Sequence, residues 1–203
     1  MIVSKRHKFI FAAFNKTGSS SVQKALWPYQ NRLYRLWLLR KYRVYYPGEP
    51  LGPFKHLAPR TIKELVGDRL WKKSFKFAFV RNPWSRLVSL YHYHRQKVPK
   101  HRLASEKTFD EWLRLGGTGS VSRLMAEFMC DENGKMIIDF VGRFENLKKD
   151  FDKICRTIGI KAELPHINRS RKDADYRLYY TSETRDLVRK IAQRDIELFG
   201  YEF

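Results

Sequence analysis

Two short polar segments hold most of the residues whose types and spacing could do chemistry. The segment KTGSSS (Lys16–Ser21) follows the apolar run KFIFAAF, and RNPWSRLVS (Arg81–Ser89) follows FKFAFV. Each segment combines a cation with hydroxyl groups where a strand-like run gives way to a helical pattern. The amides of a helix N-terminus attract anions as well, so both segments indicate a bound phosphate or sulfate.

The first segment offers one full charge and a row of small donors. Gly18 lets the backbone approach a ligand closely, and the lysine precedes this glycine. A nucleotide-binding loop of the G-x-x-x-x-G-K-[ST] type has its lysine after the last glycine instead. The expected anion ligands are Lys16, Thr17, Gly18, Ser19, Ser20 and Ser21. The alternative is that Ser19 or Ser20 only caps the helix.

The second segment places Arg81 at a strand end and Ser89 in the helix that follows. An arginine can bind a dianionic phosphate through two parallel hydrogen bonds. Ser89 comes eight residues later, about two helical turns, so it reaches the same ligand only if the loop folds back over the helix start. An arginine that simply lies at the surface is the alternative.

The order strand, turn, helix recurs along the chain and predicts an α/β fold with a mostly parallel sheet. Ligands of such sheets bind at the carboxyl ends of the strands, which predicts one site formed by both segments. Three local patterns give further expectations. Residues 31–43 resemble a basic amphipathic helix, residues 128–145 a hairpin about Asn133-Gly134, and residues 108–117 a helix with a capping box.

The last 23 residues predict one terminal helix. Its inward side chains would be Leu187, Val188, Ile191 and Leu198. Asp195 falls on the same apolar side, so we expect it to pair, with an arginine as the candidate partner.

Composition limits the classes of protein that fit. The chain has 203 residues, enough for one domain spanning 1–203, and a net charge of +20 from 41 basic and 21 acidic residues. This charge favours anionic partners: nucleic acid, acidic polysaccharide, a nucleotide or an anionic membrane. The apolar start is short for a signal peptide and no 18-residue apolar run occurs, which predicts a cytoplasmic protein. Cys130 and Cys155 lack metal-ligand spacing and are expected to be isolated reduced thiols.

Taken in order, the two segments resemble those of the sulfotransferases that use 3′-phosphoadenosine 5′-phosphosulfate (PAPS). The later stretches DFVGRFENLKKDF and LPHINRSRKD, and the C-terminal residues 179–203, are similar to the branch that sulfates carbohydrates. The resemblance spans most of the chain and implies a P-loop-like three-layer fold, a central sheet flanked by helices.

The resemblance also implies roles for individual residues. Lys16 would contact the phosphosulfate and stabilise charge on the leaving phosphate, and residues 17–21 would cradle the same group. Arg81 and Ser89 would bind the 3′-phosphate. A loop that closes over the nucleotide would contribute Asn168, Ser170 and Arg171.

A general base for the acceptor hydroxyl is expected at His56. It lies 25 residues before Arg81, where related glycan enzymes carry a catalytic histidine. The alternatives are that His56 caps the following helix, or that Glu49 is the base, as other family members use a carboxylate. Lys55 would help to bind an acidic acceptor. No paired carboxylates suited to Mg²⁺ occur, so we predict no metal.

These features together predict transfer of a sulfuryl group from PAPS to a carbohydrate hydroxyl, with 3′,5′-ADP as product. The acceptor could be an acidic polysaccharide or a lipid-linked glycan, and peripheral membrane contact is a further option. The rival interpretations are a nucleotide or small-molecule kinase, a basic nucleic-acid-binding protein, and a family member that binds nucleotide without transferring anything. The kinase would need Mg²⁺ and a lysine after the glycine.

Overall fold

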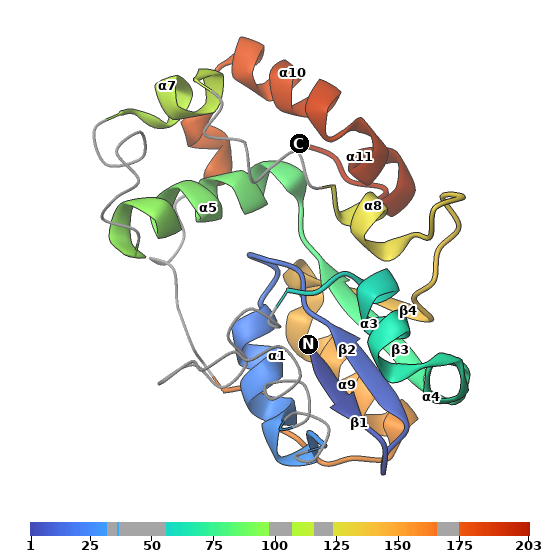
Figure 1. The fold of residues 1–203 in the computed structure, drawn as a ribbon. Helices are drawn as coiled ribbons and strands as arrows, with labels where there is room; N and C mark the ends of the chain where they lie inside the picture. The colour runs from blue at the N-terminus through green and yellow to red at the C-terminus, as the bar shows by residue number, and fades with distance from the viewer. Residues whose placement is uncertain (32–35, 37–55, 98–106, 116–123, 166–174) are drawn as a thin grey trace. The chain divides into compact units, whose positions relative to one another are not determined.

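A computed structural model describes residues 1–31, 36, 56–97, 107–115, 124–165 and 175–203 (Figure 1). The chain divides into two compact units. Unit 1 comprises Met1–Phe79 and Met129–Ile167, and unit 2 comprises Val80–Phe128 and Asn168–Phe203. The expected helix at 31–43 lies outside the described residues apart from 31 and 36. The assignment of 1–203 to a single domain stays a prediction.

Unit 1 is built around a four-stranded sheet in the order β1-β2-β3-β4. Its strands are β1 (Ile2–Ser4), β2 (Phe9–Ala12), β3 (Phe75–Val80) and β4 (Phe140–Arg143). Strands β2 and β3 run parallel, with Phe9 opposite Phe75 and Ala12 opposite Ala78. The antiparallel strand β1 pairs with β2 through the turn at residues 5–8. An α/β fold with a mostly parallel sheet is therefore confirmed, while the hairpin of β1 and β2 was not expected.

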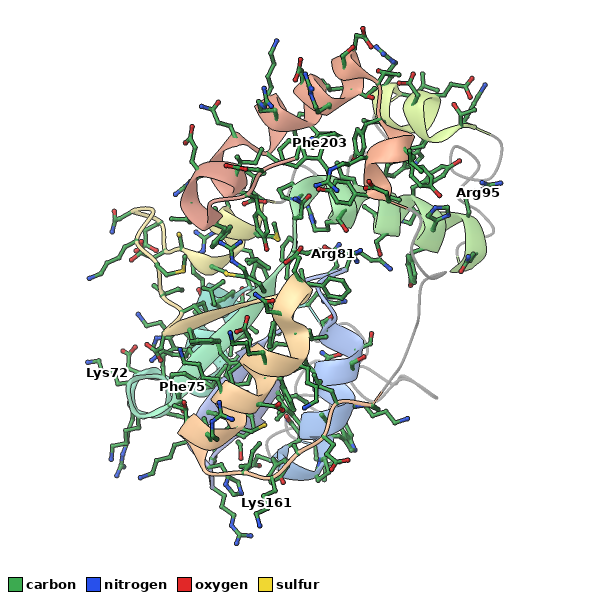
Figure 2. The ribbon with its side chains drawn as sticks, turned by 180° about the vertical axis from the view of Figure 1, so that it is seen from behind. Lys72, Phe75, Arg81, Arg95, Lys161 and Phe203 are labelled. Carbon is green, nitrogen blue, oxygen red and sulfur yellow. The ribbon has the colours of Figure 1, made fainter. Side chains whose placement is uncertain are left out.

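The helices of unit 1 follow the strands closely. They are α1 (Ser19–Leu26), the 3-10 turn η1 (Trp27–Tyr29), α3 (Pro59–Val66), α4 (Asp68–Lys73), the 3-10 turn η4 (Phe144–Asn146) and α9 (Leu147–Ile158). Pro28 lies in η1 directly after α1, and a proline cannot continue the interior of a helix. Helix α9 covers the sheet face that is turned away from the viewer in Figure 1 and toward the viewer in Figure 2.

The core of unit 1 is aromatic and joins this face to α1 and α9. Side chains alternate along a strand, so one face of β2 and β3 presents Phe9, Phe11, Phe77 and Phe79. All four are fully buried in a cluster with residues of α1 and α9. Each buried phenylalanine contributes about 1.5–3 kcal/mol, which holds the carboxyl ends of these strands firmly in place.

Unit 2 is helical in its described residues. Its elements are α5 (Pro83–Lys97), α7 (Phe109–Arg114), α8 (Met125–Met129), the 3-10 turn η5 (Tyr176–Tyr179), α10 (Ser182–Ile191) and α11 (Gln193–Phe199). Their shared core includes Trp84, Leu87, Tyr91, Trp112 and Val188. The capping box at α7 is confirmed, because Thr108 and Glu111 exchange backbone and side-chain hydrogen bonds.

A buried carboxylate ties two helices of unit 2 together. Asp195 of α11 is fully buried and accepts hydrogen bonds from the first two amides of α8, those of Met125 (3.0 Å) and Ala126 (2.7 Å). Burial raises the pKa of Asp195, while the nearby positive charge of Arg86 in α5 opposes that rise. Burial also lowers the pKa of Arg86 to about 10. The expectation that Asp195 is paired is confirmed, with two backbone amides as its hydrogen-bond partners, and Arg86 is the arginine whose charge acts on it.

Two local expectations need correction. The C-terminal segment forms two helices that meet at Ala192, so the single continuous helix was wrong. The break shifts the helical phase, with the result that Leu198 is 49% exposed and Phe199 is buried instead. The turn at Asn133-Gly134 forms, but its flanks pair only through one bridge, between Cys130 and Met136.

Neither cysteine forms a disulfide and both are buried, which agrees with the expectation of reduced thiols. Burial raises the pKa of the Cys155 thiol to about 11. Across the described part of the chain, no helix combines the length and the apolar character needed to span a membrane.

Candidate functional site

The Lys16–Ser21 loop has an unusual backbone. Lys16 has φ +63° and Gly18 has φ +77°, both in the left-handed region. A lysine in this region is strained by about 1–2 kcal/mol, so the surrounding structure must hold it there. Alternating backbone conformations of this kind turn successive amides toward one side and form a concavity that binds anions. The backbone thus supports the anion site that the residue types predict.

The start of α1 adds helix amides to this concavity. The N-cap is Gly18, and no side chain caps the helix, so the interpretation of Ser19 or Ser20 as a cap is wrong. Among the described residues, Ser21 is the first residue of α1 whose amide donates to a backbone carbonyl, that of Gly18 at 3.1 Å. The preceding amides lack an acceptor in their own helix and carry the positive end of its dipole.

The hydroxyl groups of the loop differ in what they can do. Thr17 is fully buried, and its hydroxyl donates to the carbonyl of Phe14 at 3.1 Å. That hydroxyl holds the turn, which leaves the backbone amide as the part of Thr17 that suits an anion. Ser19 and Ser21 are buried as well, whereas Ser20 is half-buried. Ser20 is therefore the most accessible hydroxyl of the loop.

The loop is backed by the start of α9, a role that the sequence did not reveal. A Cβ atom added to Gly18 would lie 2.8 Å from Leu147 Cδ2 and 3.2 Å from Phe144 Cδ2. A glycine is thus required at position 18 for two reasons: its positive φ and the close approach of these two side chains.

His56 is anchored to the strand that leads into the loop. Its Nδ1 lies 2.9 Å from the carbonyl oxygen of Ala13, directly after β2. A carbonyl only accepts, so Nδ1 carries the proton and the basic lone pair of the neutral ring belongs to Nε2. Ala13 precedes Lys16 by three residues, a span of at most about 11 Å. The N-cap of α3 is Ala58 without a side-chain bond, so the interpretation of His56 as a cap is wrong.

The Arg81–Ser89 segment lies in unit 2, which starts at Val80, and it begins directly after the end of β3 (Figure 2). The guanidinium of Arg81 donates twice to the hydroxyl oxygen of Ser85, from Nε at 3.0 Å and from Nη2 at 2.9 Å. Asn82 Oδ1 accepts from the amides of Trp84 (3.1 Å) and Ser85 (3.2 Å) at the start of α5. Pro83 opens the helix, as its position predicts.

One stripe of this helix start reaches solvent. Arg81, Ser85 and Ser89 are half-buried, whereas the residues between them are buried: Asn82, Pro83, Trp84, Arg86, Leu87 and Val88. Ser89 lies one turn beyond Ser85, a rise of about 6 Å, on the same face. That Ser89 and Arg81 reach the same ligand stays a prediction. The i, i+4 spacing of Arg81 and Ser85 was the sequence signal for a contact that the motif alone did not reveal.

The other predicted residues lie outside the described residues. They are Lys55, Asn168, Ser170 and Arg171, together with the alternative base Glu49. Within the described ranges, no group of three or more His, Cys, Asp or Glu side chains could hold a metal ion. The absence of a metal requirement stays a prediction.

Comparison with known proteins agrees with the fold. The model of the sulfotransferase family matches residues 1–202, and the chain therefore belongs to the sulfotransferase family. Membership makes the protein a transferase of sulfuryl groups. An uncharacterized protein of Archaeoglobus fulgidus is 30% identical over 116 residues, which cover 57% of this chain and 93% of that protein.

Proposed function

We propose that this sulfotransferase moves the sulfuryl group of PAPS to a hydroxyl of a carbohydrate acceptor and releases 3′,5′-ADP. The observation that carries the proposal is the register of β2 and β3. Ala12 pairs with Ala78, so the strands that lead into the Lys16 loop and the Arg81 segment are parallel and in step. Ligands of α/β sheets bind at such carboxyl ends.

Each segment has a distinct part in this proposal. The amides and ammonium of the Lys16 loop hold the 5′-phosphosulfate, and Lys16 stabilises charge on the departing phosphate. Arg81 and Ser89 hold the 3′-phosphate through charge-assisted hydrogen bonds. Bound PAPS supplies the activated sulfuryl group. The nucleotide contacts of Asn168, Ser170 and Arg171 rest on the family resemblance.

His56 is the proposed general base. Its Nδ1–H donates to the carbonyl of Ala13, which orients the ring and leaves Nε2 to take the proton of the acceptor hydroxyl. Because Ala13 leads directly into the Lys16 loop, the base and the phosphosulfate site share one rigid support. The carbohydrate acceptor is inferred from the resemblance, and Lys55 would contact an acidic one.

Ligand-induced thermal stabilisation tests the proposal. At 3′,5′-ADP concentrations of about 100 times Kd, binding stabilises the folded state by about 2.7 kcal/mol. For a chain of this size, the expected rise in Tm is about 5–10 °C. ATP with Mg²⁺ should produce no comparable rise. A shift with ATP and Mg²⁺ but none with 3′,5′-ADP would favour the kinase and contradict the proposal.

A further inference from the structure

One edge of the Arg81 guanidinium makes the contact with Ser85. Nε and Nη2 lie on the same edge and both donate to the single Oγ of Ser85. This two-point contact orients the guanidinium before any ligand binds. A long flexible side chain that was not held in this way would lose more conformational entropy on binding. The other edge, formed by Nη1 and Nη2, has the spacing that matches two phosphate oxygens.

The same contact determines what the Ser85 hydroxyl can do next. A hydroxyl has two acceptor lone pairs and one proton. Both lone pairs of Ser85 Oγ face N–H donors of Arg81, so its own O–H can act only as a donor. The Ser85 side chain lies on the half-exposed stripe between Arg81 and Ser89, the two residues assigned to the 3′-phosphate.

We infer that Ser85 is a positioning residue of the 3′-phosphate site: it holds Arg81 in the orientation that binds the phosphate. This inference rests on the proposed function, because it takes the ligand of Arg81 to be the 3′-phosphate of the nucleotide. It extends the site to a residue that the motif did not assign. It also predicts that Ser85 contributes to the preference of the site for nucleotides with a 3′-phosphate over those without one.

The test compares 3′,5′-ADP with 5′-AMP, which lacks the 3′-phosphate, by isothermal titration calorimetry. Ser85→Ala should weaken 3′,5′-ADP binding about tenfold and leave 5′-AMP binding unchanged. Ser85→Thr retains the hydroxyl and should bind 3′,5′-ADP within about twofold of the wild type. Ser182→Ala, at an exposed serine that opens α10 of the same unit, is the matched control and should change neither affinity.

A double-mutant cycle shows whether Ser85 acts through Arg81. Arg81→Lys removes the forked contact, so Ser85→Ala should have little further effect in that background. Equal weakening of 3′,5′-ADP and 5′-AMP, or additive effects in the cycle, would overturn the inference. Unaltered 3′,5′-ADP binding by Ser85→Ala would overturn it as well. A wild-type protein that binds both nucleotides equally would instead contradict the proposed function itself.

Discussion

At the scale of single residues, the orientation of one imidazole determines what the proposed base can do. His56 and Ala13 are 43 residues apart in the sequence, and their hydrogen bond sets which ring nitrogen is basic. The same contact joins His56 to the strand end that leads into the Lys16–Ser21 loop. A general base fixed in this way loses little entropy when the acceptor binds.

The substitution His56→Asn removes the basic nitrogen but can keep the hydrogen bond to Ala13. The asparagine amide can still donate to the carbonyl of Ala13, but it cannot take a proton from the acceptor. We expect kcat to fall by about 10²–10⁴-fold, with the Kd for 3′,5′-ADP unchanged. The measurement is kcat, with His56→Ala as a second variant, and full turnover by either would show that His56 is not the base.

At the scale of elements, the Lys16–Ser21 loop depends on its packing against α9. Gly18 meets Leu147 and Phe144 where the chain passes through η4 into α9. The loop therefore keeps its shape through contacts with a helix about 130 residues further along the chain. Helix α9 is held in turn by Phe151 and Ile154, which are fully buried in the core of unit 1.

Gly18→Ala should disrupt this packing. The substitution adds the cost of a left-handed alanine to that of a methyl group 2.8 Å from Leu147, together about 2–4 kcal/mol of unfolding free energy. Binding of 3′,5′-ADP should be lost in parallel.

Gly159→Ala is the matched control for this change. Its φ of +68° is similar, and nothing lies within 4 Å of the added Cβ, so only the conformational cost of about 1 kcal/mol applies. Urea unfolding gives both values. Equal losses in the two variants would show that packing against α9 does not matter.

At the scale of the whole molecule, the charge is unevenly distributed. Among the described residues, basic side chains clearly outnumber acidic ones in unit 1, whereas the two kinds nearly balance in unit 2. Of the described residues, those of unit 1 should therefore contribute most of the attraction for a polyanionic acceptor.

Paired charge reversals test this distribution. Lys149 and Arg156 are exposed on α9 of unit 1, and Lys190 and Arg194 are exposed in α10 and α11 of unit 2. Changing the first pair to glutamate should weaken binding of dextran sulfate more than changing the second pair. Raising the salt concentration should reduce this difference, because counterion release drives the binding. Equal effects of the two pairs would show that only the net charge matters.

Much of the fold and of the candidate site could be predicted from local patterns. The strand FKFAFV, the capping box at Thr108 and the helix opened by Pro83 depend on neighbours in the chain, and all three form as expected. The break at Ala192 could not be predicted in this way, because the apolar spacing continues across it. The left-handed conformation of Lys16 likewise could not be predicted from the residue types.

The sequence by itself determined the class of chemistry, since the types and order of donors in the Lys16 and Arg81 segments indicate anion binding at strand ends. Only the tertiary structure decided which atoms serve it. It assigned the Thr17 hydroxyl to the turn, the basic lone pair of His56 to Nε2, and Leu147 to the back of the Gly18 turn. The physical reason is separation along the chain: periodicity and spacing report contacts within a few turns, whereas the partners of His56 and Gly18 meet only when the sheet and its helices pack.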